Sequence, residues 1–292
     1  MNEVVLEVRD VTVVYETEDP VTAVASAGFD LHRGEILGLA GESGCGKTTL
    51  AYAVNRLHQP PARIASGTVV LHDAATGRDV DVLGLDEEEL RRFRWSKLSM
   101  VFQGAMNALN PVRTIGAQLD DTLRAHAPGM DRRARRNRSA EVLERVGVAA
   151  NRLRSYPHEL SGGMRQRVMI AMAMLLEPQV MIMDEPTTAL DVVVQRDILR
   201  EIVRLRDEMR FAVVFITHDL PLLLEISDRI AVMRHGEIVE LDTADTLYRD
   251  AAHPYTRRLL GSFPSLSGDR GAFIRSGELD GELDGELTEE TA

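Results

Sequence analysis

Apolar residues follow the period of strands in some segments and the period of helices in others. Residues 4–8 and 11–15 mix apolar with polar positions, whereas residues 36–40 form a continuous apolar run typical of a buried parallel strand. Further strands are expected at 67–71, 98–102, 180–184, 212–216, 230–233 and 237–241, and helices at 48–57, 86–95, 192–209, 219–226 and 244–261. Strands that alternate with helices predict an α/β fold.

Residues 104–157 have a different character, because they contain helical stretches, the turn Pro128-Gly129 and five arginines between positions 132 and 138. We interpret these arginines as a solvated helix face. Nucleic acid is not expected as a partner, since five arginines in an otherwise acidic chain make no continuous basic stripe. With the helix that follows Ser161, this region predicts a helical subdomain, about residues 104–176, inserted in the core.

Negative charge is concentrated at the end of the chain. The net charge of the 292 residues is −12, and the last fifteen residues carry seven carboxylates and no lysine or arginine. These are Glu278, Asp280, Glu282, Asp284, Glu286, Glu289 and Glu290. A repetitive acidic segment has too little apolar bulk to form a core. We therefore expect one folded domain, residues 1–262, followed by a disordered acidic tail, residues 263–292.

Cysteine content and hydropathy indicate a chain that is soluble by itself. The one cysteine, Cys45, leaves no partner for an internal disulfide, which suits a reducing compartment. The first residues lack the basic and then apolar pattern of a signal peptide. The longest apolar run covers residues 168–176, far short of the roughly 20 residues of a membrane span.

A glycine-rich segment follows the apolar run 36–40. It has the form GxxxxGK[ST], in which backbone N–H groups at a helix start converge on phosphate oxygens. Lys47 supplies a positive charge for the terminal phosphates, and Thr48 offers a hydroxyl group to Mg²⁺. The residues expected to contact a nucleotide here are Gly41, Ser43, Gly44, Cys45, Gly46, Lys47, Thr48 and Thr49.

Four polar residues follow other predicted strands and should reach the same sheet edge, where open α/β sheets bind ligands. Asp184 is expected to hold Mg²⁺ together with Thr48 and Gln103. Glu185 is the candidate general base that polarises an attacking water molecule. His218 and Gln103 are expected to orient that water. Catalytic residues are therefore predicted to be Glu185, His218 and Gln103.

A second glycine turn, Ser161-Gly162-Gly163, opens a predicted helix and offers another anion site. One chain already has a phosphate site at residues 41–48, so this turn needs a phosphate elsewhere. A head-to-tail dimer would give both anion sites a phosphate, because each glycine turn would cap the ATP bound to the partner chain. Tyr15 has two interpretations: its ring stacks on adenine, or it is an ordinary core or surface tyrosine.

In combination, these motifs resemble the ATP-binding subunits of ABC transporters over residues 3–262. The turn Leu160–Gln166 stands shortly before Asp184, with Gln103, Glu185 and His218 in the family's order. The resemblance implies an α/β P-loop ATPase core with an antiparallel β subdomain and an inserted helical subdomain. It also implies ATP and Mg²⁺ as cofactors, nucleotide contacts from Ser161, Gly162, Gly163, Gln166 and Tyr15, and Asp191 facing a partner cassette.

A narrower resemblance is to the oligopeptide and dipeptide importer branch, which includes nickel and some oligosaccharide systems. It is carried by residues 107–111, 114–116, 156–163 and 253–260. Two departures stand out. Gly104-Ala105 replaces the usual Asp-Pro after Gln103. No cysteine follows Cys45, so the iron–sulfur cluster common in that branch is not expected.

The branch resemblance implies an importer ATPase at the cytoplasmic face of the cell membrane. Its partners would be two permease subunits, a second ABC ATPase subunit, in a heterodimer rather than a homodimer, and indirectly an extracytoplasmic substrate-binding protein. The alternatives are a nickel or oligosaccharide importer, an exporter, and a non-transport ABC protein. The last usually has two cassettes, zinc cysteines or a long coiled coil, and this sequence has none of them.

Cys45 has two interpretations of its own. The helix start and Lys47 would raise the reactivity of its thiol, so that bound ATP protects it from labelling. Alternatively, Cys45 replaces a small residue and is shielded.

Overall fold

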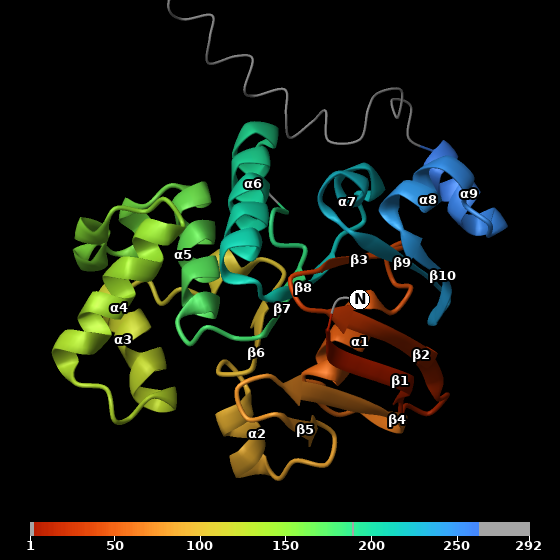
Figure 1. Ribbon diagram of the computed structural model, residues 1–292, viewed down its shortest axis with the longest axis horizontal. Helices are drawn as coiled ribbons and strands as arrows, with labels where there is room; N and C mark the ends of the chain where they lie inside the picture. The colour runs from red at the N-terminus through yellow and green to blue at the C-terminus, as the bar shows by residue number, and fades with distance from the viewer. Residues whose placement is uncertain (1–2, 189, 263–292) are drawn as a thin grey trace, which may run out of the picture.

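The computed structural model describes residues 3–188 and 190–262 and consists of two sheets and a cluster of helices (Figure 1). The larger sheet has the strand order β10-β9-β3-β8-β7-β6. Its strands are β3 (Ile36–Ala40), β6 (Leu98–Val101), β7 (Val180–Asp184), β8 (Ala212–Ile216), β9 (Arg229–Arg234) and β10 (Glu237–Thr243). All neighbours pair in parallel except β10, which is antiparallel to β9.

The smaller sheet is antiparallel, with the order β2-β1-β4-β5. It consists of β1 (Val4–Tyr15), β2 (Val21–His32), β4 (Ala62–Asp73) and β5 (Arg78–Asp81). The two expected strands 4–8 and 11–15 are one strand, whose pairing shifts register near Asp10, a residue with a φ of 51°. The strand Val21–His32 was not among the sequence predictions.

Nine α-helices lie within the described residues. Residues 47–93 contain α1 (Lys47–Val54) and α2 (Glu87–Phe93), and residues 115–174 contain α3 (Ile115–His126), α4 (Arg132–Arg145) and α5 (Gly162–Met174). The rest are α6 (Val192–Met209), α7 (Leu220–Ile226), α8 (Ala244–Asp250) and α9 (Pro254–Gly261). Short 3₁₀ turns are η1 (Ala105–Asn107), η2 (Ala150–Arg154) and η3 (Pro157–Glu159). The helix expected over 244–261 is two helices, because His253 caps α9 and Pro254 starts it.

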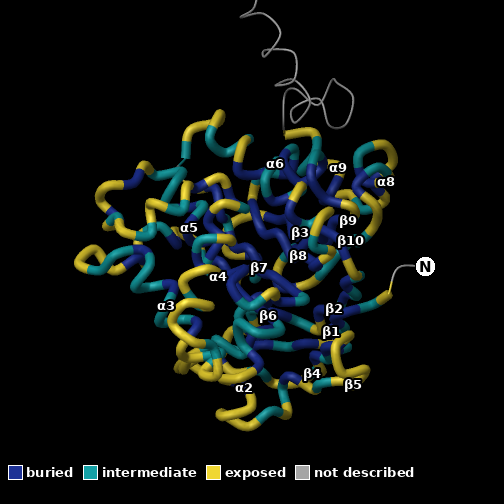
Figure 2. The backbone as a smooth tube through the Cα atoms, turned by 60° about the vertical axis from the view of Figure 1, so that its left-hand side comes forward, coloured by how far each residue is buried: buried dark blue, intermediate teal, exposed yellow. Residues whose placement is uncertain are grey.

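Alternate residues of the central strands face two separate cores. In β7, Val180 and Ile182 pack with α1 and the antiparallel sheet, whereas Met181 and Met183 pack with the helices on the opposite face. Figure 2 shows these strands as a continuous buried band inside the more exposed helices and loops. The larger sheet is therefore covered on both faces, which explains why its parallel strands read as unbroken apolar runs.

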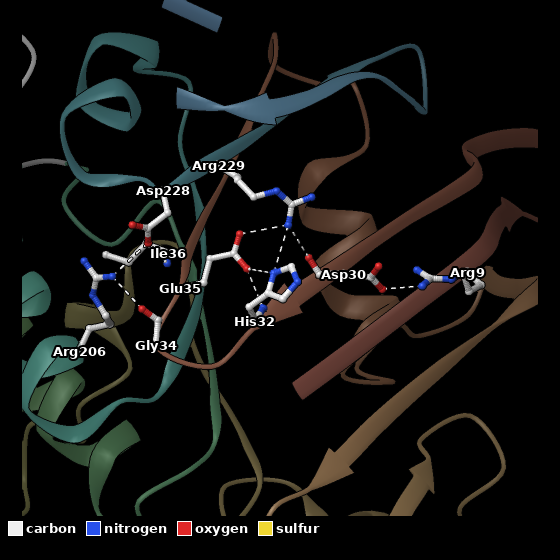
Figure 3. A network of polar contacts seen from close by, with 9 residues as sticks. All are labelled: Arg9, Asp30, His32, Gly34, Glu35, Ile36, Arg206, Asp228 and Arg229. Atoms are coloured by element: carbon white, nitrogen blue, oxygen red, sulfur yellow. Dashed lines mark hydrogen bonds and ion pairs between the residues drawn. The ribbon is translucent and has the colours of Figure 1, made fainter. Parts of the chain in front are cut away.

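A polar network ties the antiparallel sheet to the core (Figure 3). Glu35, only 4% exposed, accepts from Arg229 at 3.2 Å and contacts the His32 ring nitrogen at 2.7 Å. Asp228 accepts from the Ile36 backbone N–H at 2.8 Å and from Arg206 at 3.0 Å. These bonds cross between β2, β3, β9 and α6, so they fix β3, the strand that leads into the glycine-rich loop.

The expectation of a fully solvated arginine face is wrong for part of the run 132–138. Arg138 donates to the Leu175 carbonyl at 2.9 Å and pairs with Glu177, and Arg135 pairs with Asp120 at 2.6 Å. Both arginine side chains are mostly buried. The helical period places these two residues on the inner side of α4, while Arg132, Arg133 and Arg136 stay exposed.

Candidate nucleotide site

The loop between β3 and α1 is tightly packed against the strands beside it. Gly41 has a φ of +147°, and a Cβ atom there would lie 2.3 Å from the Met233 carbonyl oxygen. Gly46 has a φ of +108°, and a Cβ atom there would lie 2.4 Å from the Ala23 carbonyl oxygen. No other residue type fits these two positions, so the glycines of the motif are required by the backbone.

The start of α1 presents unpaired N–H groups. No side chain caps the helix at Gly46, and its first turn contains no acidic residue. The Lys47 ammonium, whose side chain is buried, donates to the carbonyl oxygens of Gly41 at 2.7 Å and Glu42 at 2.9 Å. An uncapped helix start beside a buried ammonium is a site for an anion such as phosphate.

Asp184 lies at the end of β7, directly beside this helix. Its Oδ1 accepts a hydrogen bond from the Thr48 hydroxyl at 3.3 Å, while its Oδ2 is buried and has no partner. Burial raises the pKa of Asp184, and the charge of Glu185 adds to this, although the Thr48 hydrogen bond and Lys47 oppose it. A buried carboxylate oxygen without a donor, next to a hydroxyl group, is a donor set that fits Mg²⁺.

Three predicted catalytic residues meet at the carboxylate of Glu185. Its Oε1 lies 2.9 Å from His218 Nδ1, and its Oε2 accepts from Gln103 Nε2 at 2.9 Å. The hydroxyl of Thr188, which sequence reasoning did not single out, donates to the same Oε2 at 3.0 Å. Glu185 also has a φ of 45°, a left-handed conformation that is uncommon for this residue type and frequent at functional sites.

The environment keeps the carboxyl group of Glu185 ionised. Partial burial works to raise its pKa, but the hydrogen bonds from His218 and Thr188 and the charges of His218 and Lys47 outweigh burial, so the pKa lies below its usual value. Asp184 and Glu185 are adjacent carboxylates whose pKa values are displaced in opposite directions. The buried, unpaired oxygen of Asp184 suits a cation, whereas the carboxylate of Glu185 already accepts hydrogen bonds from its neighbours.

An open cleft of about 580 Å³ lies beside the glycine-rich loop and Glu185. Asp184 and His218 do not line it, but they contact Thr48 and Glu185, which do. Ser43, Gly44 and the residues from Gly46 to Thr49 line one wall, and Gln103 and Glu185 line another. Tyr15 borders the cleft, with its hydroxyl 3.4 Å from Thr49 Oγ1. The lining also includes Val21, Thr22, Ala23, His235 and Gly236, which come from the unpredicted strand β2 and from the turn after β9.

The second glycine turn does not line this cleft. Ser161 caps α5, accepting from the Met164 N–H at 3.2 Å, and Asp191 caps α6, accepting from the Val194 N–H at 3.0 Å. Gly162 and Gly163 form the first turn of α5, and a Cβ atom on Gly163 would lie 2.6 Å from Val194 Cγ1. Gln166 is buried, with its amide nitrogen unpaired. Within one chain, these five residues therefore make no contact with the nucleotide cleft.

A contact from the far end of the domain was also missed. The Tyr255 hydroxyl on α9 accepts from the backbone N–H of Glu42 at 3.3 Å, and Arg234 lies 5.0 Å from the centre of the tyrosine ring. Tyr255 is only 4% exposed. The segment 253–256 was noted for its resemblance alone, so no local pattern revealed that it would support the glycine-rich loop.

The structure favours the shielded interpretation of Cys45. Its side chain is buried, at 8% exposure, and its Sγ lies 3.6 Å from Lys47 Nζ. Little of the thiol is open to a reagent. Among the described residues, no helix is both long and apolar enough to cross a membrane.

The fold and the cleft together define a P-loop nucleotide-binding protein of the ATPase type. The family model of the ABC transporter matches residues 24–188. The chain therefore belongs to the ABC transporter family, as one of its ATPase cassettes, and both the predicted fold class and the predicted family are confirmed.

Named relatives point to the importer branch. The chain is 42% identical to the glutathione import ATP-binding protein GsiA of Pectobacterium atrosepticum over 91% of its own length. It spans only 43% of that relative. It is 40% identical to the dipeptide transport ATP-binding protein DppD of Bacillus subtilis, covering 90% of this chain and 78% of that protein. These relatives confirm the predicted likeness to peptide importers.

A solved structure of similar fold is a dimer of the ATP-binding cassette MJ0796 in a post-hydrolysis state, bound to ADP and phosphate. The two chains align with a TM-score of 0.70 and 26% identity, over 82% of this chain and 98% of the other.

Proposed function

We propose that this chain is the ATP-hydrolysing subunit of an importer that takes up peptides through separate membrane subunits. The observation that carries the proposal is the convergence of Gln103, Thr188 and His218 on one carboxylate, Glu185, at the rim of the P-loop cleft. A hydrolase needs a fixed hydrogen-bond acceptor beside the phosphate site, and this arrangement provides one.

In this proposal, Glu185 accepts a proton from the attacking water. Its lowered pKa keeps it ionised at neutral pH, and its three neighbours hold both oxygens in place. Lys47 and the N–H groups of the loop 41–48 bind the phosphates. Bound ATP supplies the terminal phosphoryl group whose transfer to water releases free energy.

Mg²⁺ would be held by Thr48, Gln103 and Asp184. The unpaired Oδ2 of Asp184 supports this assignment, because a buried ionised oxygen without a donor is costly unless a cation meets it. Tyr15 would stack on the adenine ring from the rim of the same cleft.

We further propose that two cassettes pair head to tail. Ser161, Gly162, Gly163, Gln166 and Asp191 lie outside the cleft of their own chain, so they can serve a nucleotide only on a second cassette. The cassette dimer named above supports such pairing. A second, different cassette is the expected partner, with two permease subunits at the cytoplasmic face of the membrane and a substrate-binding protein outside.

Peptide cargo is supported by the named relatives, which import glutathione and transport dipeptides. The test is reconstitution of this chain with its permease subunits, second cassette and binding protein in liposomes. Peptides should stimulate ATP hydrolysis and enter the liposomes, and Lys47→Ala should abolish both. Stimulation by oligosaccharide or nickel instead of peptide would refute the cargo assignment while leaving the ATPase assignment in place.

A further inference from the structure

The helical subdomain carries a groove of about 690 Å³ between α3, α4 and η2 that is lined mainly by arginines. Five guanidinium groups surround it, and Asp120 is its only carboxylate. The arginines are Arg124, Arg132, Arg133, Arg136 and Arg154. The groove shares no residue with the nucleotide cleft, so ATP binding does not explain its charge.

Asp120 cannot neutralise this groove, because both of its oxygens are already used. Its Oδ1 accepts from Arg135 at 2.6 Å, and its Oδ2 accepts from Arg124 at 2.8 Å. Arg132, Arg133, Arg136 and Arg154 are exposed, and none of them pairs with a carboxylate among the described residues. Four positive charges therefore surround one groove without a counter-charge.

The fold does not need these four arginines. Anchoring of α4 is done by Arg135, which donates to Asp120 and the Met130 carbonyl, and by Arg138, which donates to the Leu175 carbonyl. Like charges gathered at one place repel one another, which costs stability. Such a cluster fits an anionic occupant with several charges, because arginine binds carboxylates in two-pronged hydrogen bonds.

We propose that this arginine groove binds the acidic segment 278–290 of the same chain. The segment supplies seven carboxylates and no cation, so its charge complements the groove. Five of these carboxylates recur at every second position from Glu278 to Glu286. In an extended chain, residues two apart share one face about 6.6 Å from each other, so these five would present one continuous acidic edge.

The segment is long enough to reach such a groove. Residues 263–277 separate it from α9 and would span on the order of 50 Å when extended, against a domain diameter of about 47 Å. Figure 1 places α3 and α4 on the side of the molecule away from α9. The acidic segment therefore reaches the groove of its own chain by crossing the domain.

The test is site-specific photo-crosslinking in the full-length chain. Leu283→p-benzoylphenylalanine places the crosslinker among the acidic residues without changing a charge. We expect crosslinked peptides from residues 116–154, with a yield that falls at least about fivefold in about 1 M NaCl, where the screening length is about 3 Å. The crosslinking readout does not involve ATP hydrolysis, so a negative result would refute this proposal without refuting the proposed function.

Matched variants test whether the groove arginines are responsible for the crosslinks from position 283. Reversal of three of them, Arg132→Glu, Arg133→Glu and Arg136→Glu, should abolish the crosslinks. Reversal of three exposed arginines elsewhere, Arg78→Glu, Arg91→Glu and Arg258→Glu, makes the same change in net charge and should leave them intact. Changing Glu278, Asp280, Glu282 and Asp284 to lysine should restore crosslinking to the groove-reversed chain.

Crosslinks outside residues 116–154, or equal losses in both triple variants, would overturn the proposal. Groove-dependent binding to phosphatidylglycerol vesicles that the acidic segment does not compete away would also overturn it, and would identify a lipid surface as the occupant.

Discussion

Replacing Asp184 by asparagine should stabilise the nucleotide-free protein and remove its response to Mg²⁺. Asp184 is a buried carboxylate with one oxygen bonded to Thr48 and the other without a partner. Burial holds its pKa above the ordinary value of 3.8. A carboxyl group whose pKa rises on folding takes up protons more readily in the folded state. Its ionised form at neutral pH therefore opposes folding, and that cost grows as the pH rises through the folded-state pKa.

Asparagine keeps the Thr48 contact while losing the charge, and a buried polar group left without a partner costs about 1–3 kcal/mol. We expect Asp184→Asn to raise the free energy of unfolding by about 1 kcal/mol at neutral pH. For a domain of this size the melting temperature should rise about 2–4 °C. In the native protein, Mg-ATP at a hundredfold excess over its Kd should add about 2.7 kcal/mol to the free energy of unfolding. The variant should lose the part of this stabilisation that depends on Mg²⁺.

The assay is calorimetry without nucleotide, with ATP and a chelator, and with Mg-ATP. Asp73→Asn is the matched control, because Asp73 is also buried but is paired with Lys97 at 2.8 Å. Burial works to raise the pKa of Asp73, but hydrogen bonds from Lys97 and Thr76 outweigh it and lower the pKa. Asp73→Asn should therefore destabilise the protein, by about 3 kcal/mol for a broken buried pair. Destabilisation by Asp184→Asn, or a full Mg²⁺ response in that variant, would refute the reasoning.

Three further predictions concern the cleft. Tyr255→Phe removes the hydroxyl that accepts a hydrogen bond from the Glu42 N–H, so the KM for ATP should rise roughly 2- to 12-fold with little change in kcat. Unchanged steady-state kinetics would show that this contact does not support nucleotide binding. His218→Ala removes a hydrogen bond that lowers the pKa of Glu185, so the acid limb of the pH–rate profile should move to higher pH; an unmoved limb would contradict this. A maleimide should label buried Cys45 far more slowly in the native protein than in denaturant, and Cys45→Ser should remain active; equal labelling rates would restore the reactive interpretation.

Local patterns were sufficient to predict the parts of the site that lie along single motifs. The loop 41–48 and the two carboxylates at the end of β7 could be located because glycine spacing and a buried apolar strand are recognisable within a few residues. Parallel strands end at one sheet edge, so the sequence predicts Gln103, Glu185 and His218 at a common edge. In the structure, Gln103 Nε2 and His218 Nδ1 each lie 2.9 Å from an oxygen of Glu185.

Features that depend on packing between distant segments could not be predicted. The contact from Tyr255 to Glu42 joins residues 213 apart, and nothing near either residue indicates it. The division of the five arginines between positions 132 and 138 into two anchored and three exposed side chains depends on where α3 and α5 pack. Strand β2 was missed because its interior contains Ser26 and Gly28 and its alternation is weak.

The central claim, that Glu185 is the base for ATP hydrolysis, is tested most directly by Glu185→Gln in the assembled transporter. The corresponding glutamate of any second cassette must be replaced too, since one intact site would mask the loss. The account predicts unchanged ATP binding and a hydrolysis rate lower by about 10²–10⁴-fold, because glutamine keeps the shape but cannot accept the proton. Hydrolysis at the full native rate in that doubly replaced assembly would contradict it.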